Sequence, residues 1–560
     1  MVILTLLYLF GCSEKKSDGL PAGDYSESQP ESMFPEVDVQ IAHSGPIHCT
    51  DPQRRSESPM YLADLGDIWS TQPVEGYTPS ADRMVGGEGV VVGDFTEDQR
   101  LDIFVPTLDR DLFFVQQSDG SFKESAAEYF PERQASVTMG ASAVDYDGDE
   151  DLDLFVLNVD TPHQLLENKG GVFEDVSIEM GIVQERYDSF GLTWGDADQD
   201  GDLDLLVLNT GYGPLGPPPW NDSANFEVAG PNVLYNFTLG ESYSINSLPN
   251  HTPEPYSCCA AFVDVNLDFV QDLYIVNDFG MYVQPNQLFF GDETGSLTPK
   301  SNYGIDIGMY GMGLAVGDIN NDNYPDFTVT DWGRNWLFLS DGYGQWYDDT
   351  ISSGFVAQSD TQQVGWGIEL HDFDNDSDVD AWVGYGYLSM DAEEQESFDS
   401  LGLYNTRYQP DALFLQEEGQ FTDVASDWGI DRESITRGGI WADINDDGFL
   451  DFISTAIDGP VEAYLANCDD SNWLRIKLHQ PGTLNTSAVG ARIKVFTESK
   501  TQLRWVLAGT SLSSSGPVEA HFGLGDAERI ERIQIVWPDQ TVSNLYHIDG
   551  NQILNVTRME

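Results

Sequence analysis

The chain has few basic residues, few histidines and few cysteines. Its 560 residues include 25 Lys and Arg against 95 Asp and Glu, with 8 His and 5 Cys. The resulting net charge of −70 repels phosphate groups, so it excludes nucleic acid and anionic lipid surfaces as partners. The His-Glu-x-x-His and Gly-x-Ser-x-Gly motifs of common hydrolases are also missing.

Aspartate, by contrast, occurs in a repeated pattern. Seven stretches carry oxygen-bearing side chains at positions 1, 3, 5 and 9, and each runs into an apolar segment. We number them loop 1 to loop 7. The residues at the four positions are, in order, Asp94, Thr96, Asp98 and Asp102; Asp145, Asp147, Asp149 and Asp153; Asp196, Asp198, Asp200 and Asp204; Asp264, Asn266, Asp268 and Asp272; Asp318, Asn320, Asp322 and Asp326; Asp372, Asp374, Asp376 and Asp380; and Asp443, Asn445, Asp447 and Asp451.

This pattern predicts calcium loops. Alternate side chains of a tight loop point to one centre, and Ca²⁺ takes about six to eight oxygen ligands. Position 7 varies freely, as Arg100 and Phe449 illustrate, so we expect its backbone carbonyl to bind. Without a cation, each close carboxylate pair repels by roughly 1 kcal/mol in water and about 4 kcal/mol at an effective dielectric of about 20. The alternative is an Asp-rich surface turn, which needs no metal. Seven copies of the pattern favour the metal, with up to seven Ca²⁺ ions bound. Loop 1 is expected to be the weakest site, because Thr96 replaces a carboxylate.

The spacing of the loops predicts the fold. Their first residues are 51, 51, 68, 54, 54 and 71 residues apart, and a period near 50 is typical of propellers and arrays. Each unit contains four short apolar stretches of strand type, with almost no helical periodicity. The loops are not EF-hands, because position 12 holds Val156, Val207 and Ser454 rather than Glu. We therefore predict an all-β protein with a seven-bladed β-propeller over residues 81–468.

Two family resemblances accompany this prediction. The repeats resemble the FG-GAP/VCBS type of integrin α-subunit propellers. The C-terminal stretch resembles the ASPIC/UnbV domain of cartilage acidic protein-like chains, through the motifs Asn472-Trp473-Leu474, Ala488-Val489-Gly490-Ala491-Arg492, His521-Phe522-Gly523-Leu524-Gly525 and Val536-Trp537-Pro538. The resemblance implies an extracellular, Ca²⁺-stabilised binding protein with no established enzymatic role.

The first 80 residues predict export and a tether. Residues 1–12 look like a lipoprotein signal ending in a lipobox, with Cys12 as the lipid-bearing residue, although the segment lacks Lys and Arg. The alternative is an apolar N-terminus with an incidental cysteine. Residues 13–35 are polar and predict a flexible tether within the 13–80 segment, whose later part could supply the outer strand that closes the ring. We expect a protein anchored to the bacterial outer membrane or cell surface, or alternatively secreted.

The other four cysteines suggest disulfides, since an exported protein meets oxidising conditions. Cys49 precedes the predicted propeller and Cys468 follows its last unit, so a bridge between them would join the two ends of the ring. Cys258 and Cys259 are adjacent. They form either a vicinal disulfide or a pair of small buried thiols.

A change of composition marks a second domain. Residues 472–560 hold 9 basic and 8 acidic residues, whereas the rest of the chain is strongly acidic. Alternating apolar residues in this segment predict a small β-sandwich-like domain. No catalytic constellation is recognisable in it.

The predicted partner surface is the face of the propeller opposite the calcium loops. Two long insertions, 210–230 and 384–410, fall between second and third strands and therefore lie on that face. Aromatic residues within them, such as Trp220 and Tyr404, are common interface anchors. The leading hypothesis is a non-catalytic surface protein that mediates adhesion or binds a protein or glycan. The alternatives are a propeller enzyme (lyase, hydrolase or dehydrogenase) acting on an extracellular polymer or small molecule, and a structural component of an extracellular complex.

Overall fold

The fold is taken from a computed structural model. It describes residues 34–45, 47, 59–67, 89–107, 110–130, 137–159, 161–182, 189–210, 230–237, 244–248, 254–292, 294–357, 363–387, 408–457 and 459–559. Cys12, Cys49, the tether up to residue 33, and most of both insertions lie outside the described residues. Within the described part, the short helices are α2 (Ala126–Tyr129) and α4 (Ala425–Trp428). Neither is long and apolar enough to cross a membrane.

Most of the described strands before position 468 belong to seven four-stranded antiparallel sheets. We number each sheet by the acidic loop that it carries. Sheet 1 contains β3 (Val91–Gly93), β4 (Asp102–Val105), β5 (Leu112–Gln116) and β6 (Phe122–Glu124); sheet 2 contains β7 (Val137–Val144), β8 (Asp153–Val159), β9 (Gln164–Asn168) and β10 (Phe173–Asp175); sheet 3 contains β11 (Ser189–Gly195), β12 (Asp204–Asn209), β13 (Val233–Asn236) and β14 (Ser244–Ser247); and sheet 4 contains β15 (Tyr256–Val263), β16 (Asp272–Asp278), β17 (Gln287–Phe290) and β18 (Thr298–Lys300).

The remaining sheets of this set follow the same plan. Sheet 5 contains β19 (Leu314–Gly317), β20 (Asp326–Val329), β21 (Trp336–Ser340) and β22 (Trp346–Asp348); sheet 6 contains β23 (Gly365–His371), β24 (Asp380–Tyr385), β26 (Ala412–Glu417) and β27 (Gln420–Asp423); and sheet 7 contains β29 (Thr436–Ala442), β30 (Asp451–Ala456), β31 (Glu462–Ala466) and β2 (Met60–Leu62). A short pair consists of β25 (Gln409–Pro410), which precedes β26 in the sequence, and β28 (Glu433–Ser434), which precedes β29.

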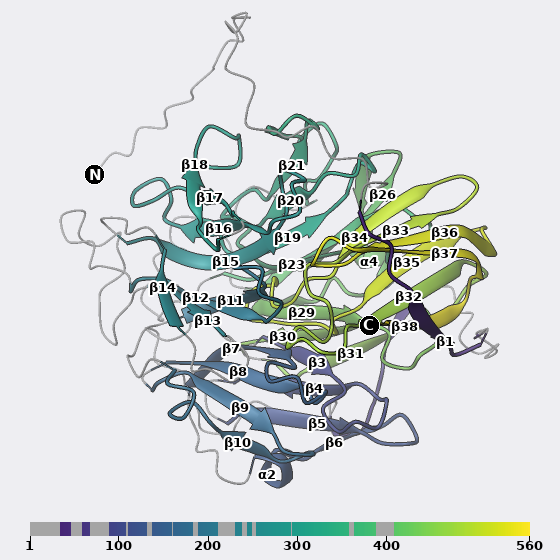
Figure 1. The fold of residues 1–560 in the computed structure, drawn as a ribbon, viewed down its shortest axis with the longest axis horizontal. Coiled ribbons are helices and arrows are strands. Elements are labelled where there is room, and N and C mark those ends of the chain that lie inside the picture. The colour runs from purple at the N-terminus through teal and green to yellow at the C-terminus, as the bar shows by residue number, and fades with distance from the viewer. Residues whose placement is uncertain are drawn as a thin grey trace, which may run out of the picture.

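The seven sheets are arranged in a closed ring. The first strand of each sheet contacts that of the next, from β3 through β7, β11, β15, β19, β23 and β29 and back to β3. These strands lie toward the middle of the molecule in Figure 1. Each sheet is covered on both faces by its neighbours. Its strands therefore carry apolar side chains on both faces, and these side chains pack between neighbouring sheets. Leu154 and Phe155 on β8, for example, belong to the separate cores on the two sides of sheet 2.

The N-terminal segment contributes to two different sheets. The expected closing strand is present, because β2 pairs with β31 and forms the outer strand of sheet 7. Met60 lies opposite Ala466 in this pairing, so residues from both ends of the repeat region share one sheet. The sequence did not predict β1 (Val39–His43), which pairs with the last strand of the chain.

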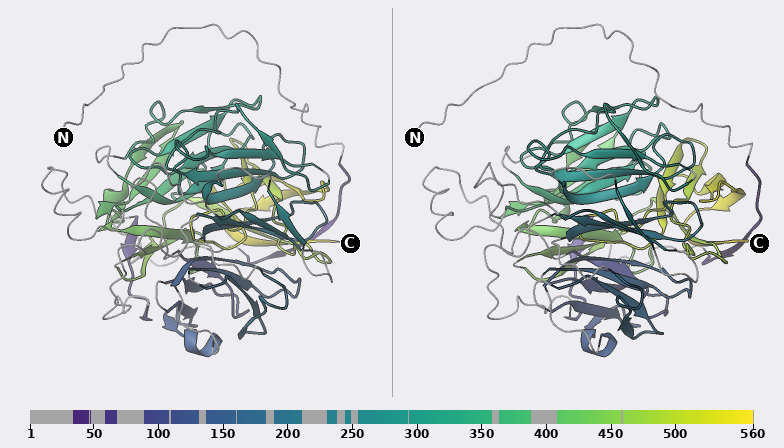
Figure 2. Two further views of the ribbon diagram at one scale, coloured as in Figure 1. Left: turned by 90° about the vertical axis from the view of Figure 1, so that its left-hand side faces the viewer. Right: turned by 60° about the vertical axis from the view of Figure 1, so that its left-hand side comes forward.

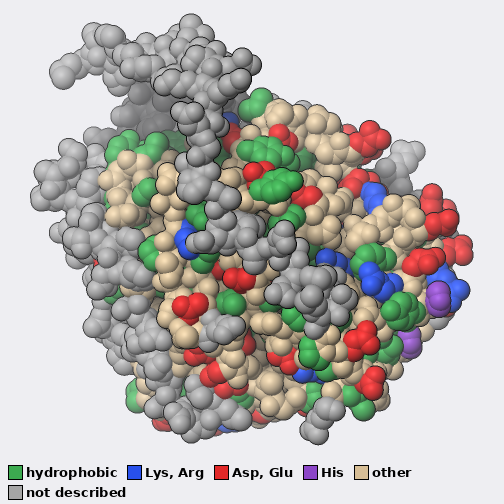
Figure 3. All heavy atoms as spheres, turned by 45° about the horizontal axis from the view of Figure 1, so that its top comes forward, with side chains coloured by type: hydrophobic (Ala, Val, Ile, Leu, Met, Phe, Trp, Pro, Cys, Tyr) green, Lys and Arg blue, Asp and Glu red, His purple; other side chains and the backbone are tan. Residues whose placement is uncertain are grey.

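The C-terminal domain consists of two four-stranded sheets. One contains β1, β38 (Gln552–Arg558), β32 (Asn472–His479) and β35 (Ala520–Gly525), and the other contains β34 (Thr501–Trp505), β33 (Arg492–Phe496), β36 (Arg529–Val536) and β37 (Val542–Asp549). They share a core that includes Leu474, Ile493, Phe522 and Ile535, each fully buried. Figure 2 shows these yellow strands beside the ring of sheets. In Figure 3 the basic side chains gather mainly on the same side as this domain, while acidic ones are spread over the visible surface.

Candidate metal centres and their cover

Each acidic loop joins the first and second strands of its sheet, so the seven loops lie at the same end of the sheets. The position 9 aspartate is the first residue of the second strand in every sheet, and it pairs with the last residue of the first strand, as Gly317 with Asp326 and Ala442 with Asp451. The chain therefore leaves one strand, turns through eight residues and re-enters the sheet beside its point of departure. This geometry forces the loop side chains together.

The position 1 aspartate holds the turn. In loop 4, Asp264 Oδ1 accepts a hydrogen bond from the Asp268 amide at 3.0 Å, and Asp264 Oδ2 accepts one from the Phe269 amide at 2.8 Å. Loops 5, 6 and 7 repeat both bonds, for example from Asp376 and Ser377 to Asp372. Positions 4 and 6 have positive φ in all seven loops, whether or not they are glycine; Leu267 and Phe269 have φ of 59° and 70°. Left-handed backbone at non-glycine residues costs about 1–2 kcal/mol each, so other interactions must stabilise this loop shape.

The position 9 aspartate connects the loop to the third strand. In sheet 6, Asp380 Oδ2 accepts from the Phe373 amide at 2.9 Å and Oδ1 accepts from the Gln416 amide at 2.8 Å. In all seven sheets the position 9 Oδ1 accepts from an amide at the C-terminal end of the third strand, within one residue of its last position. Sequence reasoning assigned this residue only to the metal. Position 9 is Asp in all seven copies, but so are positions 1 and 5, and therefore constancy in the sequence did not reveal this second role.

Three loops bring carboxylates from positions 1, 3 and 9 close enough to share an ion. In each trio, one oxygen per residue lies within 4.8 Å of the others; the trios are Asp145, Asp147 and Asp153; Asp196, Asp198 and Asp204; and Asp372, Asp374 and Asp380. Position 3 is Asn in loops 4, 5 and 7 and Thr in loop 1, so these loops have an amide or hydroxyl oxygen there. In loop 1, Arg100 also forms an ion pair with Asp98.

The electrostatics of the trios suit a hard divalent cation. Burial, followed by neighbouring carboxylates, raises the pKa of Asp196 to about 7, and burial raises the pKa of Asp153 to about 8. Asp196 Oδ1 is buried and has no hydrogen-bond partner among the residues that the structure describes. A buried carboxylate oxygen without a partner is unfavourable unless it binds a cation. The donor set is all oxygen, so the residues fit Ca²⁺ and would supply carboxylate, amide and backbone oxygens to it.

The C-terminal domain lies against this loop end of the sheets, which the sequence did not predict. Arg475 on β32 is 0% exposed, and its Nη1 donates to Asp443 Oδ2 at 2.9 Å and to Asp446 Oδ1 at 2.7 Å, both in loop 7. The same guanidinium pairs with Glu519 through Nε at 2.9 Å. Burial alone would raise the pKa of Glu519, but Arg475 and Lys477 outweigh it and hold the pKa at about 2.

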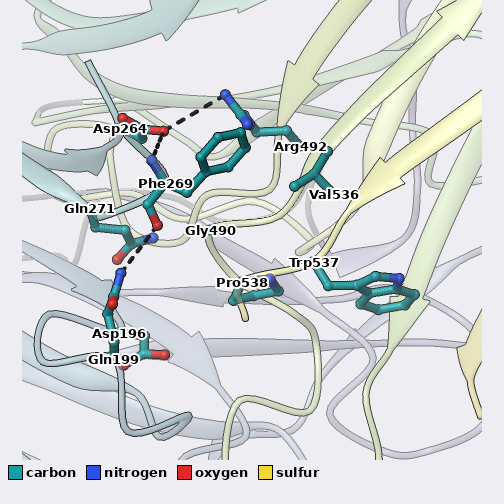
Figure 4. Close-up of a pocket in the computed structure, with 10 residues that line it drawn as sticks. All are labelled: Asp196, Gln199, Asp264, Phe269, Gln271, Gly490, Arg492, Val536, Trp537 and Pro538. Carbon is teal, nitrogen blue, oxygen red and sulfur yellow. Dashed lines mark hydrogen bonds and ion pairs between the residues drawn. The ribbon is translucent and has the colours of Figure 1, made fainter. Parts of the chain in front are cut away.

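Other loops are contacted by polar groups of the same domain. Thr486 Oγ1 donates to Asp145 Oδ2 in loop 2 at 2.7 Å, and Lys500 Nζ lies 2.8 Å from Asp378 in loop 6. Figure 4 shows the contact at loops 3 and 4, a small pocket of about 30 Å³ between the two domains. There, the Arg492 guanidinium lies 4.3 Å from the centre of the Phe269 ring and 3.7 Å from Asp264 Oδ2. The domain thus places cationic and hydroxyl groups on the position 1 aspartates of three loops.

A segment of this domain enters the middle of the ring. Residues 506–519, between β34 and β35, are called the channel segment here. The Trp194 amide donates to Ala508 O at 3.1 Å, and the Val92 amide donates to Ser515 O at 2.9 Å, so the segment bonds to the first strands β11 and β3. Its Leu512 is 4% exposed and packs in a core with Phe190 and Met312. The channel segment therefore fills space that the ring leaves at its centre.

The cysteines have two different states. Cys468 is disulfide-bonded, and Cys49, its predicted partner, lies outside the described residues. Cys258 and Cys259 are free, buried thiols on β15. The structure therefore contradicts the vicinal disulfide and confirms the alternative, a pair of small buried thiols. Burial raises the pKa of both thiols. A register shift in the pairing of β15 with β16 lies between Ser257 and Cys259, so Cys258 sits in a β-bulge.

Both family resemblances are matched by comparison with known families. The FG-GAP-like repeat matches residues 94–156, 145–207 and 264–329, and the family described as ASPIC and UnbV matches residues 482–560. Cartilage acidic protein 1 of Xenopus tropicalis is 24% identical over 499 residues, covering 74% of this chain and 73% of the frog protein. The Mus musculus protein of the same name is 24% identical over 454 residues, covering 74% of this chain and 64% of the mouse protein, less than two thirds of its length.

The chain is loosely similar to several solved structures. An Agrocybe aegerita lectin described as recognising non-reducing terminal N-acetylglucosamine has a TM-score of 0.39 at 14% identity, over 68% of this chain and 94% of the lectin. A rhamnogalacturonan lyase of Bacillus licheniformis has a TM-score of 0.37 at 12% identity, over 74% of this chain and 76% of the lyase. These scores are too low to bear on function.

Proposed function

Because the chain carries FG-GAP-like repeats and a C-terminal ASPIC/UnbV domain, and is distantly homologous to cartilage acidic protein 1, we propose that it is a calcium-binding, seven-bladed propeller protein that mediates adhesion or binds a protein or glycan. In this proposal Ca²⁺ fills up to seven loops and the protein is not an enzyme. It is exported and held at the bacterial outer membrane or cell surface through Cys12, or is secreted.

The single observation that carries the calcium part is the set of three aspartate trios. Their oxygens converge within 4.8 Å, and burial disfavours their charged forms when no cation is present. Ca²⁺ would satisfy the loop oxygens and offset the charge of the aspartates that surround each site. The disulfide bond of Cys468 supports an oxidising compartment.

The opposite face of the ring is proposed as the partner surface. The C-terminal domain already contacts loops 2, 4, 6 and 7 through the residues described above. The connections from second to third strands, which include the insertions 210–230 and 384–410, leave the sheets at the other end. We therefore place the protein or glycan partner at that end.

Thermal unfolding tests the calcium part. Sites of the extracellular type bind Ca²⁺ with dissociation constants of about 0.1–1 mM, so about a tenfold excess adds about 1.4 kcal/mol per site. Seven sites together give about 10 kcal/mol, which is comparable with the whole stability of a typical domain. We expect a large rise of the melting temperature in Ca²⁺ over EDTA, and a much smaller rise in Mg²⁺. An unchanged melting temperature would reject the calcium loops.

A further inference from the structure

A group of aromatic and acidic side chains lies on the face opposite the loops. It comprises Asp278, Tyr282, Tyr310, Asp331 and Trp332, called here the aromatic–carboxylate cluster. Asp278 is the last residue of β16, and the others belong to the connections that follow β16 and β20 and precede β19. Because successive strands are antiparallel, all three connections leave the sheets at the end away from the acidic loops.

The aromatic rings of the cluster form a row that is open to solvent. The ring centre of Tyr310 lies 6.2 Å from that of Tyr282 and 5.7 Å from that of Trp332. The Tyr310 and Tyr282 hydroxyl oxygens are 3.5 Å apart. Tyr282 is 62% exposed and Trp332 is 41% exposed. Exposed large apolar groups are common singly, but several in contact on one surface mark an interaction site.

Two carboxylates, Asp278 and Asp331, lie beside this row. Asp331 is 8% exposed; its Oδ1 accepts from the amides of Tyr310 at 3.0 Å and Trp332 at 2.6 Å. Asp278 accepts from the Phe279 amide at 2.7 Å. Neither aspartate forms an ion pair with any described Lys, Arg or His within 4.0 Å. Arg334 pairs with Asp348 at 2.7 Å and acts on Asp331 only through its more distant charge, while Asp331 Oδ2 accepts from Trp336 Nε1 at 2.8 Å.

The environment of the two carboxylates favours a cation. Burial, and then the charge of Asp331, raises the pKa of Asp278 to about 8. Burial likewise raises the pKa of Asp331. An ammonium or guanidinium group placed here would relieve this repulsion and would also be attracted by the faces of the tyrosine and tryptophan rings. The net charge of −70 adds a long-range attraction for cations.

We infer that the aromatic–carboxylate cluster binds a basic side chain, foremost a lysine, presented by a partner polypeptide. The cluster is open rather than enclosing, whereas sites for small molecules bury most of the ligand surface in a concave pocket. An exposed aromatic row beside carboxylates instead suits one side chain delivered by a larger binding surface. This inference rests on the proposed function in one respect, that the partner binds the face of the ring opposite the acidic loops. It adds the chemistry of that partner, a basic side chain.

The test uses the full-length protein and a short fluorescein-labelled Lys-Gly repeat peptide, with binding followed by fluorescence anisotropy. We expect Trp332→Ala to weaken binding about fivefold, since a cation–ring contact contributes about 1 kcal/mol. Asp278→Asn is expected to weaken binding about as much, because it removes a carboxylate charge from the site. Tyr343→Ala and Glu179→Gln are the matched controls. Tyr343 is 81% exposed and lies between β21 and β22, on the loop side, and Glu179 is exposed in the turn that follows β10. Both controls are expected to bind like the wild type.

The outcomes separate the inference from its rivals. Equal losses in the controls would mean that the peptide responds only to total charge, and would overturn the inference. Binding of the lysine-acetylated peptide or of maltohexaose that depends on Trp332 would overturn the cationic partner in favour of a neutral one. If Trp332→Ala fails to fold, Tyr282→Ala takes its place, because Tyr282 is more exposed. Calcium-dependent melting is recorded on the same samples, so failure of the calcium proposal and failure of this inference remain distinguishable.

Discussion

At the scale of single residues, the acidic loops contain two kinds of aspartate. Position 9 is built into the sheet through bonds from its own loop and from the third strand, as Asp380 is through Phe373 and Gln416. Position 3, as Asp374, accepts only a long bond of 3.3 Å, from the Asp376 amide. The first kind therefore supports the fold with or without an ion, whereas the second contributes little to the fold and is available to the proposed ion.

This difference predicts separable effects of two alanine substitutions. Asp380→Ala leaves two buried amides without acceptors and is expected to lower the free energy of unfolding by about 2–5 kcal/mol, in EDTA as well as in Ca²⁺. Asp374→Ala is expected to reduce stability in Ca²⁺ and to leave it equal or higher in EDTA, because it removes one of several crowded carboxylates. Urea unfolding in the two buffers measures both. Similar losses in EDTA would contradict the division of roles.

His163 is a second residue with a defined physical role. It is 4% exposed; its Nδ1 accepts from the Asn158 amide at 3.1 Å and its Nε2 lies 3.0 Å from Ser189 Oγ. Burial lowers its pKa from 6.5 to about 4. The folded protein therefore keeps the ring neutral at pH values where the unfolded chain binds a proton.

The sign of the pH effect follows from this lowered pKa. The contribution of His163 to stability is fully present above about pH 6.5 and is lost as the pH falls toward about 4. The difference between the two pKa values corresponds to about 3 kcal/mol. Urea unfolding at a series of pH values should show a shallower acid loss in His163→Gln than in the wild type. If the free energy of unfolding fell equally with pH in the two proteins, His163 would not be the source of the acid loss.

At the scale of elements, β32 joins the two domains through one buried arginine. Arg475 connects loop 7 to Glu519, and its side chain is 1% exposed. Removing one member of such a network leaves a buried charge without a partner, which is strongly destabilising. The docking of the C-terminal domain therefore depends on side chains that face the acidic loops.

Arg475→Gln is expected to lower the free energy of unfolding by about 3–5 kcal/mol and to speed proteolytic cleavage between the domains. Arg529→Gln is the control, because Arg529 is a surface residue of the same domain whose pairing with Asp549 is exposed on both sides. We expect no measurable change for it. Equal protease resistance of the Arg475 variant and the wild type would show that other contacts hold the domain.

At the scale of the whole molecule, the ring is closed by chain segments far apart in sequence. β2 completes sheet 7, β1 completes a sheet of the C-terminal domain, and the channel segment bonds to β3 and β11. Each of these pairings has a high sequence separation, so each carries a large loop-closure cost. A covalent link at Cys468 reduces that cost by restricting the unfolded chain.

Reduction of this disulfide is expected to lower the free energy of unfolding by about 2–5 kcal/mol. Cys468→Ser should be destabilised by a similar amount and should no longer respond to the reductant. Cys258 and Cys259 are free thiols, so Cys258→Ser should retain the full response of the wild type. Melting curves with and without reductant measure these effects. Equal melting temperatures of the wild type in both conditions would contradict the stabilising role.

The sequence by itself determined the repeat, the strand pattern and the positions of the loops. These features are local: aspartates at alternate positions followed by an apolar stretch specify a turn that enters a strand, and Asp326 and Asp451 begin second strands for that reason. The composition change near residue 472 likewise reflects a local property of the C-terminal segment, its balance of charge.

Only the tertiary structure decided what covers the loops and what lies at the centre of the ring. The contact of Arg475 with Asp443 joins residues that no local pattern relates, and the insertion of Leu512 beside Met312 depends on how two separately folded surfaces fit. The pairing of β1 with β38 is of the same kind, because a short strand with one apolar face can complete many sheet edges. Local side-chain patterns specify strands and turns, but the choice among distant surfaces depends on shape and charge that exist only after folding.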